Sequence, residues 1–148
     1  MDLTATYTFD APVERVWNVL MDTQAVGECL PGCKGLQPRG DDRYDVELAV
    51  AVAAVAGSFT GTVSLADKQP PQSYTLVFEG KGRQGFVKGQ TRVTLEAEGQ
   101  TTRVSVAAQA DVGGMIARVG QRLLMGVARM TMDRFYACLA GRVTGQGG

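Results

Sequence analysis

The chain of 148 residues contains no histidine. This absence excludes a Ser-His-Asp triad, a Cys-His dyad, a zinc site with histidine ligands and a haem held by histidine. Any acid–base chemistry would have to use a carboxylate, tyrosine, lysine or cysteine whose pKa is moved by burial or by a neighbouring charge. We therefore expect none of these histidine-based catalytic or metal sites.

Net charge, cysteine and long apolar runs are also scarce. Lys and Arg number 15 and Asp and Glu number 15, so the net charge is 0 and no nucleic-acid partner is expected. The three cysteines, with no cationic and apolar leader at the N-terminus, predict a cytoplasmic chain with reduced thiols. The longest apolar run, 48–56, is too short to span a bilayer.

What is present fits one folded domain: 45% of residues are hydrophobic and 20% are charged. Apolar residues alternate over 3–9, which predicts a strand. They then recur at helical spacing from Val13 to Met21, with Pro12 suited to the helix start. A second short helical turn is expected after Asp22, ending at Pro31 and Gly32.

Period-two alternation dominates the middle of the chain and predicts an antiparallel meander. Residues 46–52 are rich in alanine, so a helix is the alternative there, although the alternation favours a strand. With the first strand, six or seven strands are expected. The remaining alternating stretches are 59–65, 74–78, 93–97 and 104–110.

Gly113 and Gly114 precede a helical pattern, which predicts one helix from Met115 to about Gly141. We expect an α+β domain over 1–141, with a curved sheet around this helix, and a flexible tail over 142–148. Two wide, rigid elements leave space between them, so an apolar cavity is predicted. Its expected lining is Tyr74, Phe78 and Val106 from strands, with Leu123, Val127 and Met130 from the helix.

Three further patterns have competing interpretations. Gly80 to Gly85 matches the glycine spacing of a dinucleotide-binding loop, but strands on both sides favour a hairpin without a nucleotide. Cys29 and Cys33 lie four residues apart, and with Cys138 they provide too few ligands for zinc, which favours buried structural thiols. Among the carboxylates near predicted element ends, helix capping or exposure is favoured over a functional acid; these are Asp22, Glu79 and Asp111.

The C-terminal helix is basic and rich in methionine: residues 115–141 contain four arginines, one aspartate and four of the six methionines. On a regular helix, Arg118, Arg122 and Arg129 fall within about 40° of each other. Such a stripe can contact anionic lipid or an acidic partner. The alternatives are a solvated helix face, or pairing of the arginines with Asp22 or Glu28 of the same chain.

Several of these segments together resemble one known family. The residues are 9–17 (FDAPVERVW), Asp22, 29–33 (CLPGC), 79–82 (EGKG) and 113–122 (GGMIARVGQR). They are similar to the carbon monoxide dehydrogenase G-subunit family, which belongs to the START-like, polyketide cyclase and lipid-transport superfamily. The resemblance covers about residues 3–139, and the 29–33 and 113–122 segments are its specific parts.

The resemblance implies a helix-grip fold and a non-catalytic accessory role beside a molybdenum hydroxylase of the carbon monoxide dehydrogenase type. It also implies a quinone-like or lipid ligand, no covalent cofactor, and a part in bringing that enzyme to the membrane. Some members carry a C-terminal extension suited to membrane attachment, and this chain stops at Gly148. Weak peripheral contact at the inner membrane face, or none, is therefore expected. The alternative function is an enzyme, a cyclase, dehydratase or hydrolase acting on a hydrophobic molecule in the same cavity.

Overall fold

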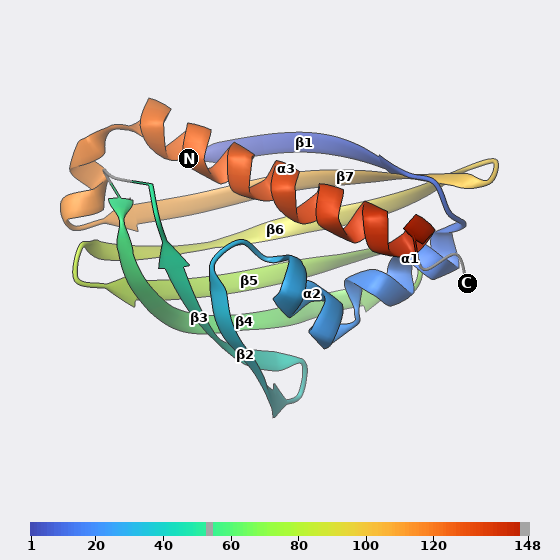
Figure 1. Ribbon diagram of the computed structural model, residues 1–148, viewed down its shortest axis with the longest axis horizontal. Helices are drawn as coiled ribbons and strands as arrows, with labels where there is room; N and C mark the ends of the chain where they lie inside the picture. The colour runs from blue at the N-terminus through green and yellow to red at the C-terminus, as the bar shows by residue number, and fades with distance from the viewer. Residues whose placement is uncertain (53–54, 146–148) are drawn as a thin grey trace.

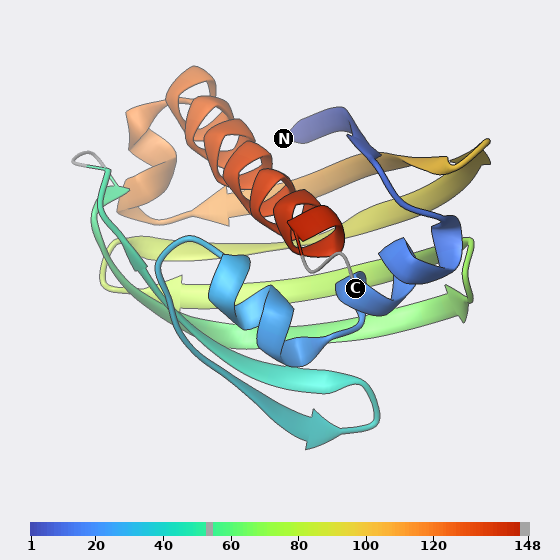
Figure 2. The same ribbon diagram turned by 45° about the vertical axis from the view of Figure 1, so that its right-hand side comes forward.

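The chain forms a curved antiparallel sheet of seven strands, with the helices on its concave side (Figures 1 and 2). In this computed structural model, residues 1–52 and 55–145 are described. The strand order is β1-β7-β6-β5-β4-β3-β2. Each strand from β2 to β7 is therefore joined to the next by a hairpin, and β1 pairs with β7 at one edge of the sheet. The strands are β1 Asp2–Phe9, β2 Cys33–Gly40, β3 Arg43–Val50, β4 Gly57–Gln69, β5 Ser73–Gly82, β6 Gly85–Glu98 and β7 Thr101–Gly113; the helices are α1 Val13–Leu20, α2 Thr23–Cys29, η2 Met115–Val119 and α3 Gln121–Gly145.

The predicted alternation is confirmed in these strands. Tyr74 of β5 lies opposite Val93 of β6, and Val93 lies opposite Val106 of β7, so the three side chains share one face. All three are buried. The apolar positions of the central strands therefore form the concave face, and the polar positions between them face outward.

Strand β2 was not predicted. Its sequence, CKGLQPRG, contains one large aliphatic side chain together with glycine and proline, which gives no period-two signal. It forms because it pairs with β3 as an edge strand, with two register shifts along its length. The helix alternative for 46–52 is wrong, since β3 runs to Val50.

The two short helices begin as predicted after β1. The carboxylate of Asp22 accepts hydrogen bonds from the backbone N–H groups of Gln24 and Ala25, at 3.0 and 3.3 Å. This is an N-cap, which satisfies donors that the first turn of α2 leaves free. The capping interpretation of Asp22 is thus confirmed.

The long C-terminal helix differs from the prediction at both ends. Residues Met115–Val119 form a 3₁₀ helix, and Gly120, with φ of 99°, separates it from α3. That backbone conformation favours glycine, so Gly120 ends one helix and precedes the next. The predicted end of the helix at about Gly141 is also wrong, since α3 continues to Gly145. The helix continues because Val143 packs into the core, where it is 4% exposed. Residues 146–148 of the predicted tail lie outside the described residues.

The core lies at the end of the sheet that α1 and the second half of α3 cover. Phe9, Val16 and Leu139 are completely buried there. From α3 the core takes Met132, Phe135 and later residues, and none before Met132. The other buried members are Ala11, Trp17, Leu20, Ala25, Cys29, Tyr74, Val93, Leu95, Val104, Val106, Tyr136 and Val143.

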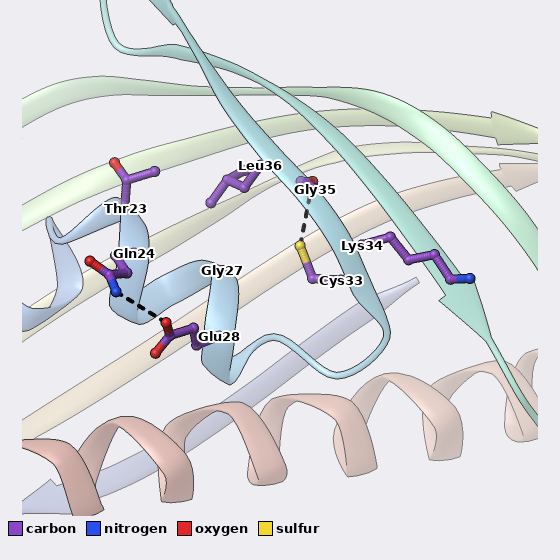
Figure 3. A pocket seen from close by; sticks show the side chains of 8 residues that line it. All are labelled: Thr23, Gln24, Gly27, Glu28, Cys33, Lys34, Gly35 and Leu36. Atoms are coloured by element: carbon purple, nitrogen blue, oxygen red, sulfur yellow. Dashed lines mark hydrogen bonds between the residues drawn. The ribbon is translucent and has the colours of Figure 1, made fainter.

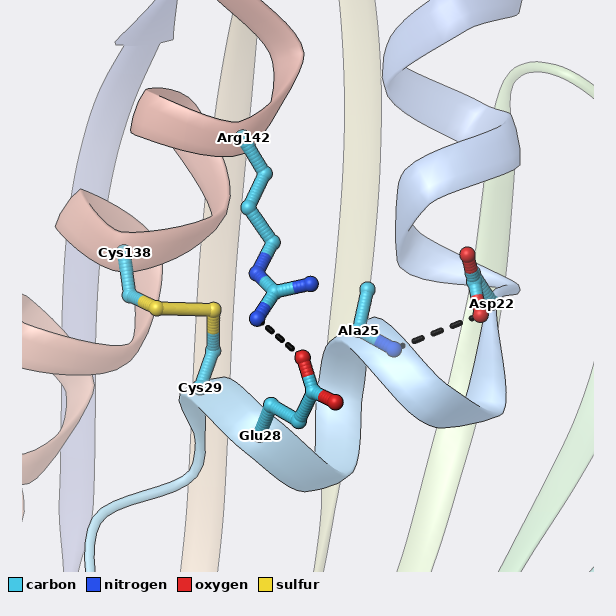
Figure 4. Close-up of a disulfide and its surroundings, with 6 residues drawn as sticks. All are labelled: Asp22, Ala25, Glu28, Cys29, Cys138 and Arg142. Atoms are coloured by element: carbon cyan, nitrogen blue, oxygen red, sulfur yellow. Dashed lines mark hydrogen bonds and ion pairs between the residues drawn. A yellow bond between two sulfur atoms is a disulfide. The ribbon is translucent and has the colours of Figure 1, made fainter. Parts of the chain in front are cut away.

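A disulfide joins α2 to α3 (Figure 4). Cys29 and Cys138 are 109 residues apart in sequence, with Cα atoms 5.5 Å apart. Beside them, the Arg142 guanidinium pairs with the Glu28 carboxylate across the same two helices. The expectation of three reduced thiols is therefore wrong for two of them, and Cys33 is the free cysteine.

Candidate functional site

Beyond the core, the concave face changes from buried to half-buried. The side chains there are apolar and come from five adjacent strands, yet each keeps surface that a water molecule can reach. In a packed interior such side chains would be closed off, so α3 does not completely cover this part of the sheet. The residues are Val46, Leu48, Phe59, Val63, Phe78, Val87 and Val112. We call them the half-buried apolar surface.

A second, smaller packed region lies at the far end of the sheet. Val55 and Ile116 are 5% and 6% exposed and lie outside the main core. The Ile116 N–H donates to the Gln84 carbonyl at 2.8 Å, and the Gln84 side chain donates to the Ala56 carbonyl. These contacts tie η2, the β5–β6 turn and the segment before β4 together. The half-buried apolar surface thus lies between two packed regions.

The described concave positions of the strands carry no charged side chain. Glu79 and Asp111 lie between concave positions and are exposed, which confirms the expectation of solvated strand ends. Among the described residues there is also no group of three or more cysteine or carboxylate side chains that could hold a metal ion. The surface can therefore bind an apolar molecule, and it offers no carboxylate for acid–base chemistry.

Two tyrosines lie where the core meets this surface. Tyr74 of β5 and Tyr136 of α3 are 4% and 5% exposed. The Trp17 ring packs edge-on against Tyr74, with centroids 5.6 Å apart, and Tyr7 stacks on Tyr136 at 4.5 Å. Burial raises the pKa of both hydroxyls, so both remain protonated in the working pH range.

Tyr7 has a different environment. Its hydroxyl donates to the Asp133 carboxylate at 2.7 Å near the surface, where β1 meets α3. Partial burial, and then the hydrogen bond to Asp133, raise the pKa of Tyr7. The Arg129 guanidinium donates to the Thr4 carbonyl at 2.9 Å on the same side. These contacts fix α3 against the edge strand.

The structure does not bring the six predicted cavity residues together. Tyr74 and Val106 are in the core, and Phe78 belongs to the half-buried apolar surface. Leu123 and Met130 are 40% and 38% exposed. On the helical wheel they lie about 160–180° from Leu139, so they point away from the core.

The prediction chose the wrong side of α3 because the first half of this helix is apolar on both sides. Leu124 and Ala128 are as apolar as Leu123 and Val127, and the spacing alone fits either set. On the wheel, Leu124 and Ala128 fall within about 60° of Leu139, on the side that faces the sheet. The residues that sequence reasoning missed are therefore Leu124, Ala128 and Tyr136.

The outward side of α3 is hollowed into a groove of about 500 Å³. Its lining is Val119, Arg122, Leu123, Gly126, Val127 and Met130. The predicted stripe of three arginines is wrong in part. Arg118 lies on the 3₁₀ helix before Gly120, whereas Arg122 and Arg129 share α3, and the guanidinium of Arg129 is held by Thr4.

A second groove, of about 410 Å³, lies between α2 and β2 (Figure 3). Its lining is mixed in polarity: Thr23, Gln24, Gly27, Glu28, Cys33, Lys34, Gly35 and Leu36. The polar groups bond to near neighbours, with Gln24 donating to Glu28 at 3.2 Å and the Cys33 thiol to the Gly35 carbonyl at 3.4 Å. The groove contains one carboxylate, one amine and one thiol, and the thiol is turned toward the backbone.

The glycine motif at Gly80 to Gly85 is a hairpin, as the flanking strands predicted. Gly82 ends β5 and pairs with Gly85 at the start of β6. Because no helix follows the motif, it lacks the N-terminal helix turn that holds a pyrophosphate. The absence of nucleotide binding remains a prediction.

Comparison with known proteins gives a family and a fold. The family described as the carbon monoxide dehydrogenase G subunit (CoxG) matches over residues 6–144. A conserved protein from Geobacillus kaustophilus is 31% identical, with a TM-score of 0.94 over 97% of this chain and 95% of that one. No curated protein matches the chain.

More distant structures share the fold alone. A START superfamily protein from Mycobacterium smegmatis has a TM-score of 0.74 at 14% identity, over 98% of both chains. The Zhui aromatase/cyclase from Streptomyces sp. R1128 has a TM-score of 0.69 at 17% identity, over 97% of this chain and 93% of that one. These similarities support the START-like helix-grip fold. Within the described part of the chain, no helix is both long and apolar enough to cross a membrane.

Proposed function

The chain belongs to the CoxG family, and we propose that it is a non-catalytic accessory protein that holds an apolar small molecule between its sheet and α3. The ligand class is a quinone or a lipid. The partner is a molybdenum hydroxylase of the carbon monoxide dehydrogenase type, and the protein acts on the cytoplasmic side of the membrane.

The observation that carries this proposal is the half-buried apolar surface. It extends over five strands, it carries no charge, and it lies between two packed regions. A surface of this kind in the middle of a fold loses stability unless something covers it, because exposed apolar area costs about 25 cal/mol per Å². A ligand that covers it gains the same free energy.

The same surface argues against the enzyme alternative. Cyclases, dehydratases and hydrolases need an acid or base that can exchange a proton within the binding site. On the described concave positions the titratable groups are tyrosine hydroxyls and a cysteine thiol, and burial raises the pKa of Tyr74 and Tyr136 away from neutrality. Turnover of a bound polyketide-like substrate by the purified protein would favour the enzyme instead.

The first test fills the site from the sheet. Gly80 lies on the concave face opposite Val87, and a Cβ placed on it meets its nearest atoms at 3.8 Å, so a side chain fits. We expect Gly80→Leu to weaken binding of menadione about tenfold. The new side chain would overlap with the bound ligand, and a steric cost of about 1.4 kcal/mol corresponds to that factor. Quenching of Trp17, the one tryptophan, measures the affinity.

The matched control is Glu79→Leu, which adds the same side chain next to Gly80 on the outer face. It should bind menadione like the original protein. If Gly80→Leu binds menadione equally well, the ligand is not held on this surface. Native mass spectrometry of the protein from its own source then identifies what travels with it.

The partner is proposed to contact the groove on the outward side of α3. Leu123 and Met130 provide exposed apolar area, and Arg118 and Arg122 form no ion pair within the described residues. A groove is filled by protruding side chains, whereas a bilayer surface is flat. The occupant is therefore an acidic protein surface with apolar side chains at its centre.

We expect Leu123→Ser with Met130→Ser to weaken binding to the molybdenum hydroxylase about tenfold or more, since apolar groups at an interface centre dominate affinity. Arg118→Gln with Arg122→Gln should mainly slow association and reduce its salt dependence. Biolayer interferometry at low and high salt measures both effects. Val77→Ser removes an equally exposed apolar side chain elsewhere and serves as the control. Loss of binding to phosphatidylglycerol vesicles, with enzyme binding unchanged, would assign the groove to a membrane.

A further inference from the structure

Two buried hydroxyls in the core have no hydrogen-bond partner. Within the described residues, neither the Tyr74 nor the Tyr136 hydroxyl makes a hydrogen bond. Yet every side-chain N or O atom that is completely buried in this part of the chain has a partner. Both hydroxyl oxygens must therefore reach open space, although the residues that carry them are 4% and 5% exposed.

Tyr74 belongs to the sheet and Tyr136 to α3, and both side chains lie on the side where these two elements pack together. Tyr74 lies on the concave face of β5, in line with Leu76 and Phe78. Tyr136 lies on the inward side of α3, on the same side as Leu139. Burial, and then the charge of an ionised Tyr74, raise the pKa of Tyr136. The concave positions of β5 run from Tyr74 in the core through Leu76 to Phe78, so Tyr74 lies at the inner end of the half-buried apolar surface.

A hydroxyl of a largely buried ring that has no partner within the protein must find one in water or in a ligand. Phenylalanine would fill either position with the same ring and no polar atom. Two such hydroxyls beside an apolar surface fit the pattern of a binding site, in which a few polar groups orient a ligand among apolar side chains.

We propose that the Tyr74 and Tyr136 hydroxyls donate hydrogen bonds to an acceptor oxygen, such as a quinone or ester carbonyl, at the inner end of the ligand. This inference rests on the proposed function and adds the chemistry that selects the ligand. An apolar molecule with a carbonyl at one end satisfies both hydroxyls, and a hydrocarbon of the same shape leaves them unpaired.

The experiment compares two probes that differ only in the carbonyls: menadione and 2-methylnaphthalene. Calorimetry measures both affinities for the original chain, Tyr74→Phe, Tyr136→Phe and the double variant. Each single variant should bind menadione about fivefold more weakly, the usual effect of one buried hydrogen bond. Affinity for 2-methylnaphthalene should stay within twofold. The infrared carbonyl stretch of bound menadione should shift upward in the double variant, which a merely structural role would not cause.

Tyr7→Phe is the matched control. Its ring stacks on Tyr136, but its hydroxyl bonds to Asp133 near the surface. It should lower the midpoint of thermal unfolding and leave menadione affinity unchanged. Tyr74→Phe and Tyr136→Phe should weaken menadione binding and leave the midpoint of thermal unfolding unchanged. The reason is that their hydroxyls make no hydrogen bond in the free protein.

The outcomes separate this inference from the proposed function. If neither probe binds the original chain, the proposed ligand site fails. If both probes bind and the tyrosine variants leave menadione affinity and the carbonyl stretch unchanged, the site stands and the hydrogen-bonding role is wrong. If Tyr74→Phe or Tyr136→Phe lowers the unfolding midpoint as Tyr7→Phe does, that hydroxyl has a structural partner and the inference fails.

Discussion

Replacing Cys29 and Cys138 together with alanine is expected to lower the free energy of unfolding by about 4 kcal/mol. The bond closes a loop of about a hundred residues, since its cysteines are 109 positions apart. In the unfolded chain such a long crosslink removes much conformational freedom, and its loss favours unfolding. Urea denaturation under oxidising conditions measures the difference, and treatment of the original protein with dithiothreitol should reproduce it.

Two variants at the same place isolate the disulfide. Cys33→Ala removes the free thiol and should change stability by less than about 1 kcal/mol, because the crosslink remains. Arg142→Gln breaks the exposed pair with Glu28 and should also cost less than about 1 kcal/mol. Equal stability of oxidised and reduced protein would show that the close packing of α2 on α3, rather than the covalent bond, holds these helices together.

The disulfide also shows where sequence reasoning ends. The number of cysteines and the N-terminal residues were the basis for predicting reduced thiols. Neither property gives the distance between Cys29 and Cys138. That distance depends on α2 packing against the second half of α3, which is a tertiary contact. Cys33, four residues from Cys29 in sequence, remains free.

The fold was predictable because its signals are local and repeated. Alternation such as Leu3, Ala5, Tyr7 and Phe9 indicates a strand whichever strand it pairs with. Strand β2 was not predicted because it is a strand through its pairing with β3 rather than through its own sequence pattern. The break at Gly120 was not predicted because a glycine inside a helical pattern is often tolerated. Only its φ of 99° shows that η2 ends there and that α3 begins after it.

The site was harder to predict because it depends on which side of α3 faces inward. Leu123 and Leu124 are adjacent and identical in type, so their order in the sequence cannot show which of them is exposed. The second half of the helix gives a clearer signal, with Tyr136, Leu139 and Val143 at helical spacing. Continuing that face backward from Leu139 leads to Ala128 and Leu124, and this would have identified the inward side.

The protein is expected to lose about 2 kcal/mol of stability between pH 10 and pH 11 because of two tyrosines. Burial raises the pKa of Tyr74 and Tyr136 above the ordinary value near 10, so both stay protonated in the folded chain. In the unfolded chain both ionise from about pH 10 upward. Ionisation then favours the unfolded state by about 1 kcal/mol per tyrosine between pH 10 and pH 11, because half of the unfolded chains are already ionised at each position at pH 10. Below pH 10 the effect fades, and at neutral pH it is absent.

Urea denaturation at pH 8, 10 and 11 measures this loss, and the Tyr74→Phe and Tyr136→Phe double variant is its control. The double variant cannot ionise at these positions, so it should keep about 2 kcal/mol more of its stability over the same interval. Other groups that titrate in alkali act equally on both proteins and cancel in the comparison. If the two proteins lose stability in parallel, the hydroxyls are already solvated in the folded chain. The space that they face would then be open to bulk water rather than enclosed by the fold, and it would not suit an apolar ligand.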